Sequence, residues 1–124
     1  MARVSFDFDG TLTRPQVEEY CAELIKRGCD VIIVTYRMLK NASEVIELAD
    51  RLNISHHNIY FTQTTSKVGY LKGCAFHLDD DGYTISEINK SGVTTAINCF
   101  GNNSWKDKCE RLLNKKIYQN KIPD

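Results

Sequence analysis

The sequence predicts an α/β protein with a central parallel sheet of about five strands. Two observations carry this prediction. Short apolar runs alternate along the chain with stretches that have helical periodicity. The run at 31–34 is apolar and β-branched throughout, as expected for a strand that is buried on both faces. Because the connections between these runs are short, we expect a parallel sheet with helices covering both of its faces.

Each expected element follows from the apolar pattern and from residues that begin or end helices. Pro15 suits the first turn of a helix, and Gly28 suits its end. Asn41 stands three residues before Glu44, as in a capping box. The predicted strands span 3–8, 31–34, 58–61, 74–78 and 93–100. The predicted helices span 15–27, 41–52, 66–71, 84–90 and 105–118. Together they predict a Rossmann-like, three-layer α/β/α fold.

Length and composition predict one soluble domain. The chain has 124 residues, of which 42% are hydrophobic and 26% charged, and its formal net charge is zero. This length is enough for one core and leaves little room for a second, so we expect a single domain over 1–124. A neutral chain does not require nucleic acid or an anionic membrane as a partner. No long apolar run is present, which predicts a cytoplasmic protein without a membrane span.

The cysteines do not predict a disulfide framework or a zinc site. Their number is odd, their spacing is irregular and no CxxC pair occurs. We expect them to be reduced and mostly buried thiols. They are Cys21, Cys29, Cys74, Cys99 and Cys109.

The most informative segment is 4–13, with the sequence VSFDFDGTLT. A short apolar strand ends here in two carboxylates, Asp7 and Asp9, and a glycine turn follows at once. Alternate side chains of a strand share a face, so both acids are expected to project in the same direction. Two like charges this close repel each other unless a cation or a shared proton lies between them. The segment therefore predicts a Mg²⁺ site, and a solvated Asp–Gly turn is the alternative.

More polar residues follow the other predicted strands, at the edge where parallel sheets bind their ligands. Thr35, Tyr36 and Arg37 follow the second strand, and Lys67 lies at the start of the helix after the third. The fourth strand leads into an acidic run at 79–81. A carboxylate nucleophile, a hydroxyl donor, a fixed cation and acids for a metal are the groups that phosphoryl transfer to a carboxylate requires.

These four segments, in this order, resemble the motifs of the haloacid dehalogenase (HAD)-like phosphatases over residues 3–100. The resemblance implies a Mg²⁺-dependent phosphomonoester hydrolase that works through an aspartyl-phosphate. It implies that Asp7 is the nucleophile and that Asp9 is the general acid and then the general base. It also implies that Thr35 and Lys67 bind the phosphate. Lys72 is a competitor for the role of Lys67.

The resemblance also implies the ligands of the metal. These are Asp7, the backbone carbonyl of Asp9, and Asp79, with support from Asp80. The three adjacent acids at 79–81 leave their register open, and Asp81 is expected to be a turn residue.

Several neighbours of these residues have two open interpretations. Tyr36 and Arg37 are candidate substrate contacts, with packing and solvent exposure as the ordinary alternatives. His56 and His57 are expected at the surface. His77 should point away from its strand neighbours and is expected to be structural.

No insertion that could form a cap domain follows the first or the third predicted strand. The resemblance therefore predicts an open site, with a nucleotide, a nucleic-acid end or another macromolecular phosphate as substrate. An oligomer in which a neighbour acts as the lid is the other possibility. The C-terminal segment is locally basic, which suits nucleic acid, although a solvated helix face is the ordinary explanation. Its basic residues are Lys106, Lys108, Arg111, Lys115, Lys116 and Lys121.

Two other functions are weighed against the phosphatase. One is a non-catalytic α/β module that binds phosphate or metal. The other is a receiver-like phosphoacceptor domain, which has a similar length, clustered acids, a threonine and a lysine. The order along the chain argues against a receiver, because there the adjacent acids come first and the lysine last. In this chain the adjacent acids follow Lys67.

Overall fold

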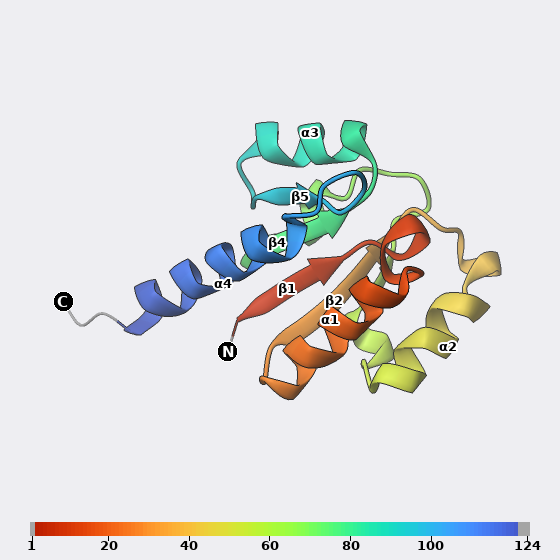
Figure 1. Ribbon diagram of the computed structural model, residues 1–124. Coiled ribbons are helices and arrows are strands. Elements are labelled where there is room, and N and C mark those ends of the chain that lie inside the picture. The colour runs from red at the N-terminus through yellow and green to blue at the C-terminus, as the bar shows by residue number, and fades with distance from the viewer. Residues whose placement is uncertain (1, 122–124) are drawn as a thin grey trace.

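The computed structural model describes residues 2–121, and the side chains of residues 2–115. Its centre is an all-parallel sheet of five strands in the order β3-β2-β1-β4-β5 (Figure 1). The strands are β1 (Arg3–Phe6), β2 (Asp30–Thr35), β3 (Ile59–Phe61), β4 (Cys74–Asp79) and β5 (Ala96–Asn98). The α-helices are α1 (Pro15–Lys26), α2 (Ser43–Leu52), α3 (Gly82–Ser91) and α4 (Trp105–Lys121). The predicted Rossmann-like α/β fold is confirmed.

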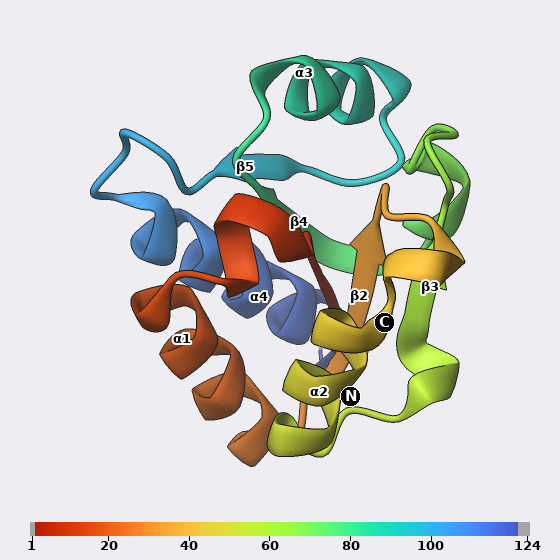
Figure 2. The same ribbon diagram turned by 90° about the vertical axis from the view of Figure 1, so that its right-hand side faces the viewer.

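Helices cover both faces of the sheet, but unequally. Figures 1 and 2 show α3 on one side of the sheet and α1, α2 and α4 on the other. Because strand side chains alternate between the faces, the buried apolar residues form two separate cores. The larger core joins α1, α2 and α4 to residues such as Val4, Phe6 and Ile33. The smaller core joins Ile88 of α3 to Ile32 and Val34.

The first strand is shorter than predicted. β1 ends at Phe6, and the chain then turns at Phe8–Leu12, where Asp9 and Gly10 have non-helical backbone angles. Gly10 has φ +72° in this turn, a backbone conformation that glycine adopts without steric cost. The alternation of side chains therefore stops before Asp9, so the strand geometry on which the expected common direction of Asp7 and Asp9 depends is absent.

Three further boundaries differ from the prediction. β5 spans only Ala96–Asn98, and the helix expected at 66–71 is a 3₁₀ turn at Val68–Tyr70, since so short a segment cannot sustain an α-helix. Asn41 does not cap α2. It lies in a 3₁₀ turn at Leu39–Asn41, and its carbonyl accepts a hydrogen bond from Arg37 instead.

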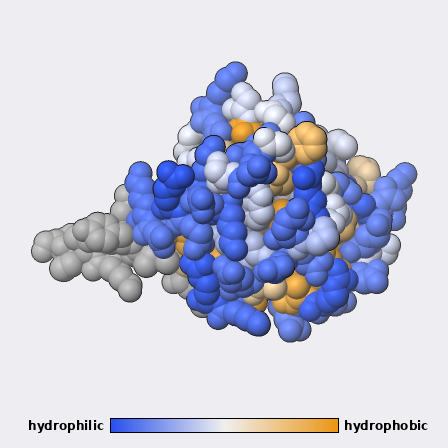
Figure 3. Space-filling model, in the orientation of Figure 1, coloured by the Kyte–Doolittle hydropathy of each residue, from blue (hydrophilic) through white to orange (hydrophobic). Residues whose placement is uncertain are grey.

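The remaining expectations concern the surface and the thiols. No cysteine forms a disulfide, and all but Cys29 are buried. Among residues 2–121 no helix is both long and apolar enough to cross a bilayer. The face seen in Figure 3 is largely hydrophilic, with small separate apolar patches. The predicted basic side chains of Lys116 and Lys121 lie outside the described side chains.

Candidate functional site

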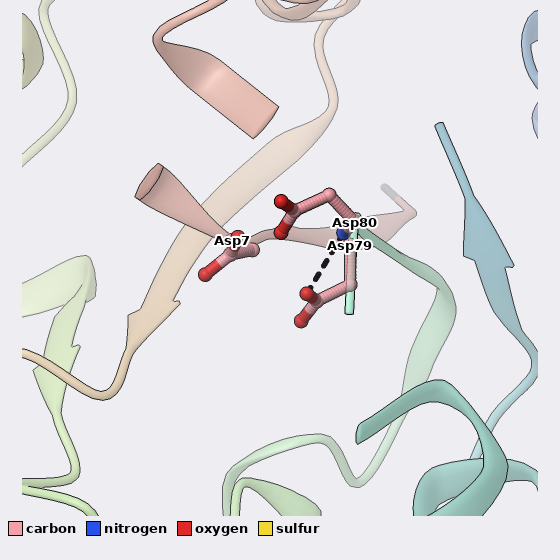
Figure 4. A group of neighbouring side chains, drawn as sticks. All are labelled: Asp7, Asp79 and Asp80. Atoms are coloured by element: carbon pink, nitrogen blue, oxygen red, sulfur yellow. Dashed lines mark hydrogen bonds between the residues drawn. The ribbon is translucent and has the colours of Figure 1, made fainter. Parts of the chain in front are cut away.

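The register of β1 and β4 brings two acids together at the carboxyl edge of the sheet. Phe6 pairs with Leu78, so Asp7 and Asp79 follow at equivalent positions of neighbouring strands. Asp80 is the next residue along the chain. Ligand oxygens of these three side chains lie within 4.8 Å of one another (Figure 4). Asp7 and Asp79 are buried and Asp80 is half-buried, so these residues form a possible metal-binding group.

A buried lysine connects two of these acids. Lys67 Nζ lies 2.8 Å from Asp7 Oδ1 and 2.8 Å from Asp79 Oδ2. The Lys67 side chain is almost completely buried, whereas Lys72, its competitor in the sequence, is exposed. One ammonium group facing three carboxylates leaves an excess of negative charge, which favours binding of a cation.

Asp79 is held by a hydrogen-bonded chain beneath the acidic group. His77 Nε2 lies 2.8 Å from Asp79 Oδ2, and Ser5 Oγ lies 2.8 Å from His77 Nδ1. Burial lowers the pKa of His77, so the neutral imidazole donates its Nε2 proton to Asp79 and accepts one from Ser5. His77 is structural, as expected. The sequence reasoning missed Ser5, although a serine inside an apolar strand is a usable signal.

The two buried carboxyl groups have opposite pKa shifts. Burial and the nearby charge of Asp79 raise the pKa of Asp7 to about 7, against the opposing effect of Lys67. Burial alone would also raise the pKa of Asp79, but hydrogen bonds from His77 and Lys67 and the charge of Lys67 hold it below its usual range. Asp79 is therefore the fixed anion of the group, and Asp7 exchanges a proton near neutral pH.

The position of the Asp80 carboxylate depends on the absence of a side chain at Gly10. A Cβ atom on Gly10 would overlap the carboxylate of Asp80. The glycine turn after β1 therefore leaves the space that the third acid occupies. Asp81 belongs to another interaction, as expected of a turn residue. Its carboxylate accepts hydrogen bonds from the backbone N–H and the hydroxyl of Thr84 at the start of α3.

Asp9 is not part of the acidic group. Its exposed carboxylate pairs with Arg37 through two hydrogen bonds, from Nε at 2.9 Å and from Nη2 at 2.8 Å. These bonds, despite some burial, hold the pKa of Asp9 below its usual value. Arg37 also contacts Glu44 at 3.0 Å, and its guanidinium lies over the ring of Phe8. Arg37 thus has defined partners within the chain, which the sequence did not predict.

Thr35 is the last residue of β2, and Tyr36 follows it. Thr35 is buried, and its hydroxyl oxygen accepts a hydrogen bond from the backbone N–H of Arg37. Lys67 Nζ lies 4.5 Å from the centre of the Tyr36 ring. His56 and His57 are exposed at a distant turn, as expected.

The comparisons with known proteins add no relative. No family model matches this chain, and neither a curated protein nor a solved structure does. From its fold and its acidic group, the chain is a parallel α/β protein with a possible metal site of Asp7, Asp79 and Asp80.

The buried lysine generates the first prediction. Replacing Lys67 by methionine leaves Asp7 and Asp79 buried without their counter-charge, so we expect the free energy of unfolding to fall by about 3–5 kcal/mol. Lys72→Met, at the exposed position, is the matched control and should change it by less than about 0.5 kcal/mol. Urea unfolding of both variants at pH 8 measures this. Equal stabilities would show that Lys67 does not neutralise the group.

The second prediction concerns Gly10 in the turn after β1. Gly10→Ala should push Asp80 out of the acidic group and weaken binding of a divalent cation by about tenfold or more. Gly28→Ala is the control, because Gly28 has φ +88° and open space around its Cβ position. Both variants carry the same backbone strain. Calorimetric titration with Mn²⁺ measures the two affinities, and equal affinities would contradict the placement of Asp80.

The third prediction concerns the pH dependence that follows from the raised pKa of Asp7. Between about pH 4 and about pH 7 the folded metal-free protein holds a proton that the unfolded chain has released, so the contribution of Asp7 to stability falls as pH rises. A divalent cation must displace that proton. We therefore expect its affinity to rise by about tenfold per pH unit up to about pH 7 and then level off.

Titration with Mn²⁺ from about pH 5.5 to about pH 8.5 measures this dependence. In Asp7→Asn the slope below pH 7 should disappear, because the titrating carboxyl is gone. A wild-type affinity that is flat over this range would show that Asp7 ionises at the ordinary value.

Proposed function

We propose that this protein is a Mg²⁺-dependent phosphomonoester hydrolase of the HAD-like kind, with Asp7 as its nucleophile. One observation carries the proposal: Asp7 is a buried carboxylate that shares a lysine with Asp79 and lies beside Asp80 at the carboxyl edge of a parallel sheet. Phosphoryl transfer needs a positioned nucleophile and compensation of the negative charge on the transferred group. These residues supply both within one cluster.

The donor set fits Mg²⁺. Asp7, Asp79 and Asp80 offer only carboxylate oxygens, and hard divalent cations prefer oxygen ligands. When bound, the ion supplies a Lewis acid that polarises a phosphoryl oxygen and helps to orient the ester. The excess negative charge of the group gives the ion its electrostatic attraction.

The proposed reaction has two steps. The carboxylate of Asp7 forms a bond to phosphorus while the bond between phosphorus and the ester oxygen breaks, and a proton from Asp9 goes to the departing oxygen. Water then attacks the aspartyl-phosphate, Asp9 takes a proton from that water, and inorganic phosphate leaves with Asp7 regenerated. Each step moves one proton through Asp9.

The surrounding residues have proposed roles that their contacts allow. Lys67 is fixed by two carboxylates, so its charge can offset that of the phosphoryl oxygens without a change of position. The hydroxyl oxygen of Thr35 already accepts a hydrogen bond from Arg37, which leaves its hydrogen for a phosphoryl oxygen. Thr11 donates to Asp7 Oδ2 at 3.0 Å and fixes the orientation of the nucleophile.

The pair between Asp9 and Arg37 sets a condition on this mechanism. A carboxylate with a depressed pKa is ionised at neutral pH, so it must gain a proton before it can act as an acid. Asp9 therefore has to exchange its bonds with Arg37 before the first step. Arg37 would then be released next to the substrate, which gives this arginine a second proposed role in binding anionic groups.

The sheet order argues against the receiver-like alternative. Receivers have the flavodoxin-like strand order 2-1-3-4-5, whereas this sheet has the order 3-2-1-4-5.

The short segments 7–14 and 62–67 follow β1 and β3, so the acidic group has little chain to cover it. An open site of this kind accepts a phosphate on a leaving group that extends outward.

Hydrolysis of p-nitrophenyl phosphate with Mg²⁺ tests the proposal. We expect turnover that is lost with EDTA and reduced about a thousandfold or more in Asp7→Asn, because this removes the nucleophile. Asp107→Asn, an exposed position on α4, is the control and should retain activity. Acid quenching should trap a phosphoryl group on Asp7.

Two outcomes would contradict the proposal. Activity that survives in Asp7→Asn would exclude Asp7 as the nucleophile. Absence of turnover on a panel of phosphomonoesters by folded, Mg²⁺-bound protein would favour the non-catalytic binding module.

A further inference from the structure

A hollow of about 390 Å³ lies beside the acidic group, on the face of the sheet that α3 covers. Its walls come from the segment after β3 and from the first two turns of α3. Tyr36, Thr64, Tyr83 and Glu87 are among the residues that line it. The volume is within the range of small-molecule sites. Two other hollows lie beside β5 and α4, away from the acids, and a third, on α3, shares Tyr83 and Glu87 with this one and is also lined by Lys90.

This hollow is joined to the acidic group by two contacts. Lys67 Nζ, which contacts Asp7 and Asp79, lies over the ring of Tyr36, and the Tyr36 hydroxyl donates to Thr84 Oγ1 at 2.8 Å in the wall of the hollow. The backbone N–H of Asp81 donates to Asp79 Oδ1 at 3.1 Å. Asp81 therefore belongs to the hollow and contacts the acidic group directly, whereas Tyr36 contacts that group through Lys67. A leaving group on a phosphate held at Asp7 has this hollow beside it.

The segment after β3 is strained where it meets the hollow. Gln63 and Thr64 have φ +54° and φ +71°, and left-handed backbone is unfavourable for a β-branched residue such as Thr64. The preceding Thr62 has a buried hydroxyl with no hydrogen-bond partner among the described residues. Strain of this kind persists where the surrounding structure holds a segment for a function. Here it places Thr64 in the wall.

The lining has an acidic and aromatic character. Glu87 is half-buried and forms no ion pair with the described residues, and Asp81 adds a second carboxylate. Among the described lining residues none is basic. Tyr83 is 81% exposed, so its ring gains little from packing within the chain. Carboxylates together with an exposed tyrosine ring such as that of Tyr83 are groups that recognise an alkylammonium ion.

We infer that this hollow binds a positively charged alkylammonium group on the leaving group of the phosphomonoester. The inference rests on the proposed function for the phosphate end, and adds the chemistry of the other end. The ammonium would lie against the ring of Tyr83, because Lys67 Nζ already lies over the ring of Tyr36, and its charge would balance that of Glu87 and Asp81. Amino-alcohol phosphates are the substrates that carry both groups.

Binding of choline without its phosphate tests the hollow separately from any hydrolysis. The full chain, ¹⁵N-labelled, is titrated with choline and with its neutral isostere 3,3-dimethylbutan-1-ol, with and without Mg²⁺. Choline should shift the backbone amides of Thr64, Tyr83 and Thr84, with an affinity about fivefold or more above that of the isostere. Glu87→Gln should remove most of this difference, and Glu47→Gln, an exposed glutamate of α2, should retain it.

Three outcomes would overturn the inference. Equal affinities for choline and its isostere would show that the hollow does not recognise charge. Shifts confined to other parts of the chain would show that it is not the site. A nucleoside that shifts these amides where choline does not would assign the hollow to a base instead.

Hydrolysis then distinguishes the two proposals. The ratio of kcat/KM for phosphocholine to that for the phosphate ester of the neutral isostere should be about fivefold or more, and should fall in Glu87→Gln. Selective binding of choline without hydrolysis of either ester would overturn the proposed function and support the hollow. Hydrolysis of both esters at the same rate, with no selective binding of choline, would overturn the hollow and support the phosphatase.

Discussion

The contact of Lys67 with Asp7 and Asp79 is the interaction on which the rest of the site depends. Two carboxylates buried on adjacent strands would repel each other strongly without a cation between them. Lys67 reaches them from the segment after β3, which is two strands away from β1 in the sheet. The buried ion pair thus ties the loop after β3 to the centre of the carboxyl edge, and the same loop forms one wall of the neighbouring hollow.

The acids around this lysine differ in function because their surroundings differ. Asp79 receives hydrogen bonds from His77, Lys67 and two backbone N–H groups, which together favour its ionised form. Asp7 accepts fewer hydrogen bonds, and burial is the main cause of its raised pKa. One carboxylate is therefore a permanent anion, while the other can bind a proton or a cation, or attack an electrophile. An enzyme that uses a carboxylate as nucleophile requires this kind of asymmetry.

Much of the fold could be predicted from the sequence, because burial on both faces leaves continuous apolar strands such as 31–34. The rule that ligands bind at the carboxyl edge also predicts that Asp7, Lys67 and Asp79 lie in one region. The bond between Asp9 and Arg37 could not be predicted, because it depends on where β1 ends and on how two side chains rotate. The contact of Ser5 with His77 depends on the register between β1 and β4, which periodicity alone does not give.

The register between β1 and β4 limits the insertions and deletions that the protein can tolerate. Asp7 and Asp79 meet because β1 and β4 end level with each other, and this is a matter of spacing as much as of residue type. Losing or gaining a single residue within β1 would turn every side chain of the strand to the opposite face. Phe6 would then face the lysine, and Asp7 would enter the larger apolar core. Evolution of this chain is therefore freer to exchange residues on its helices than to alter the length of its central strands.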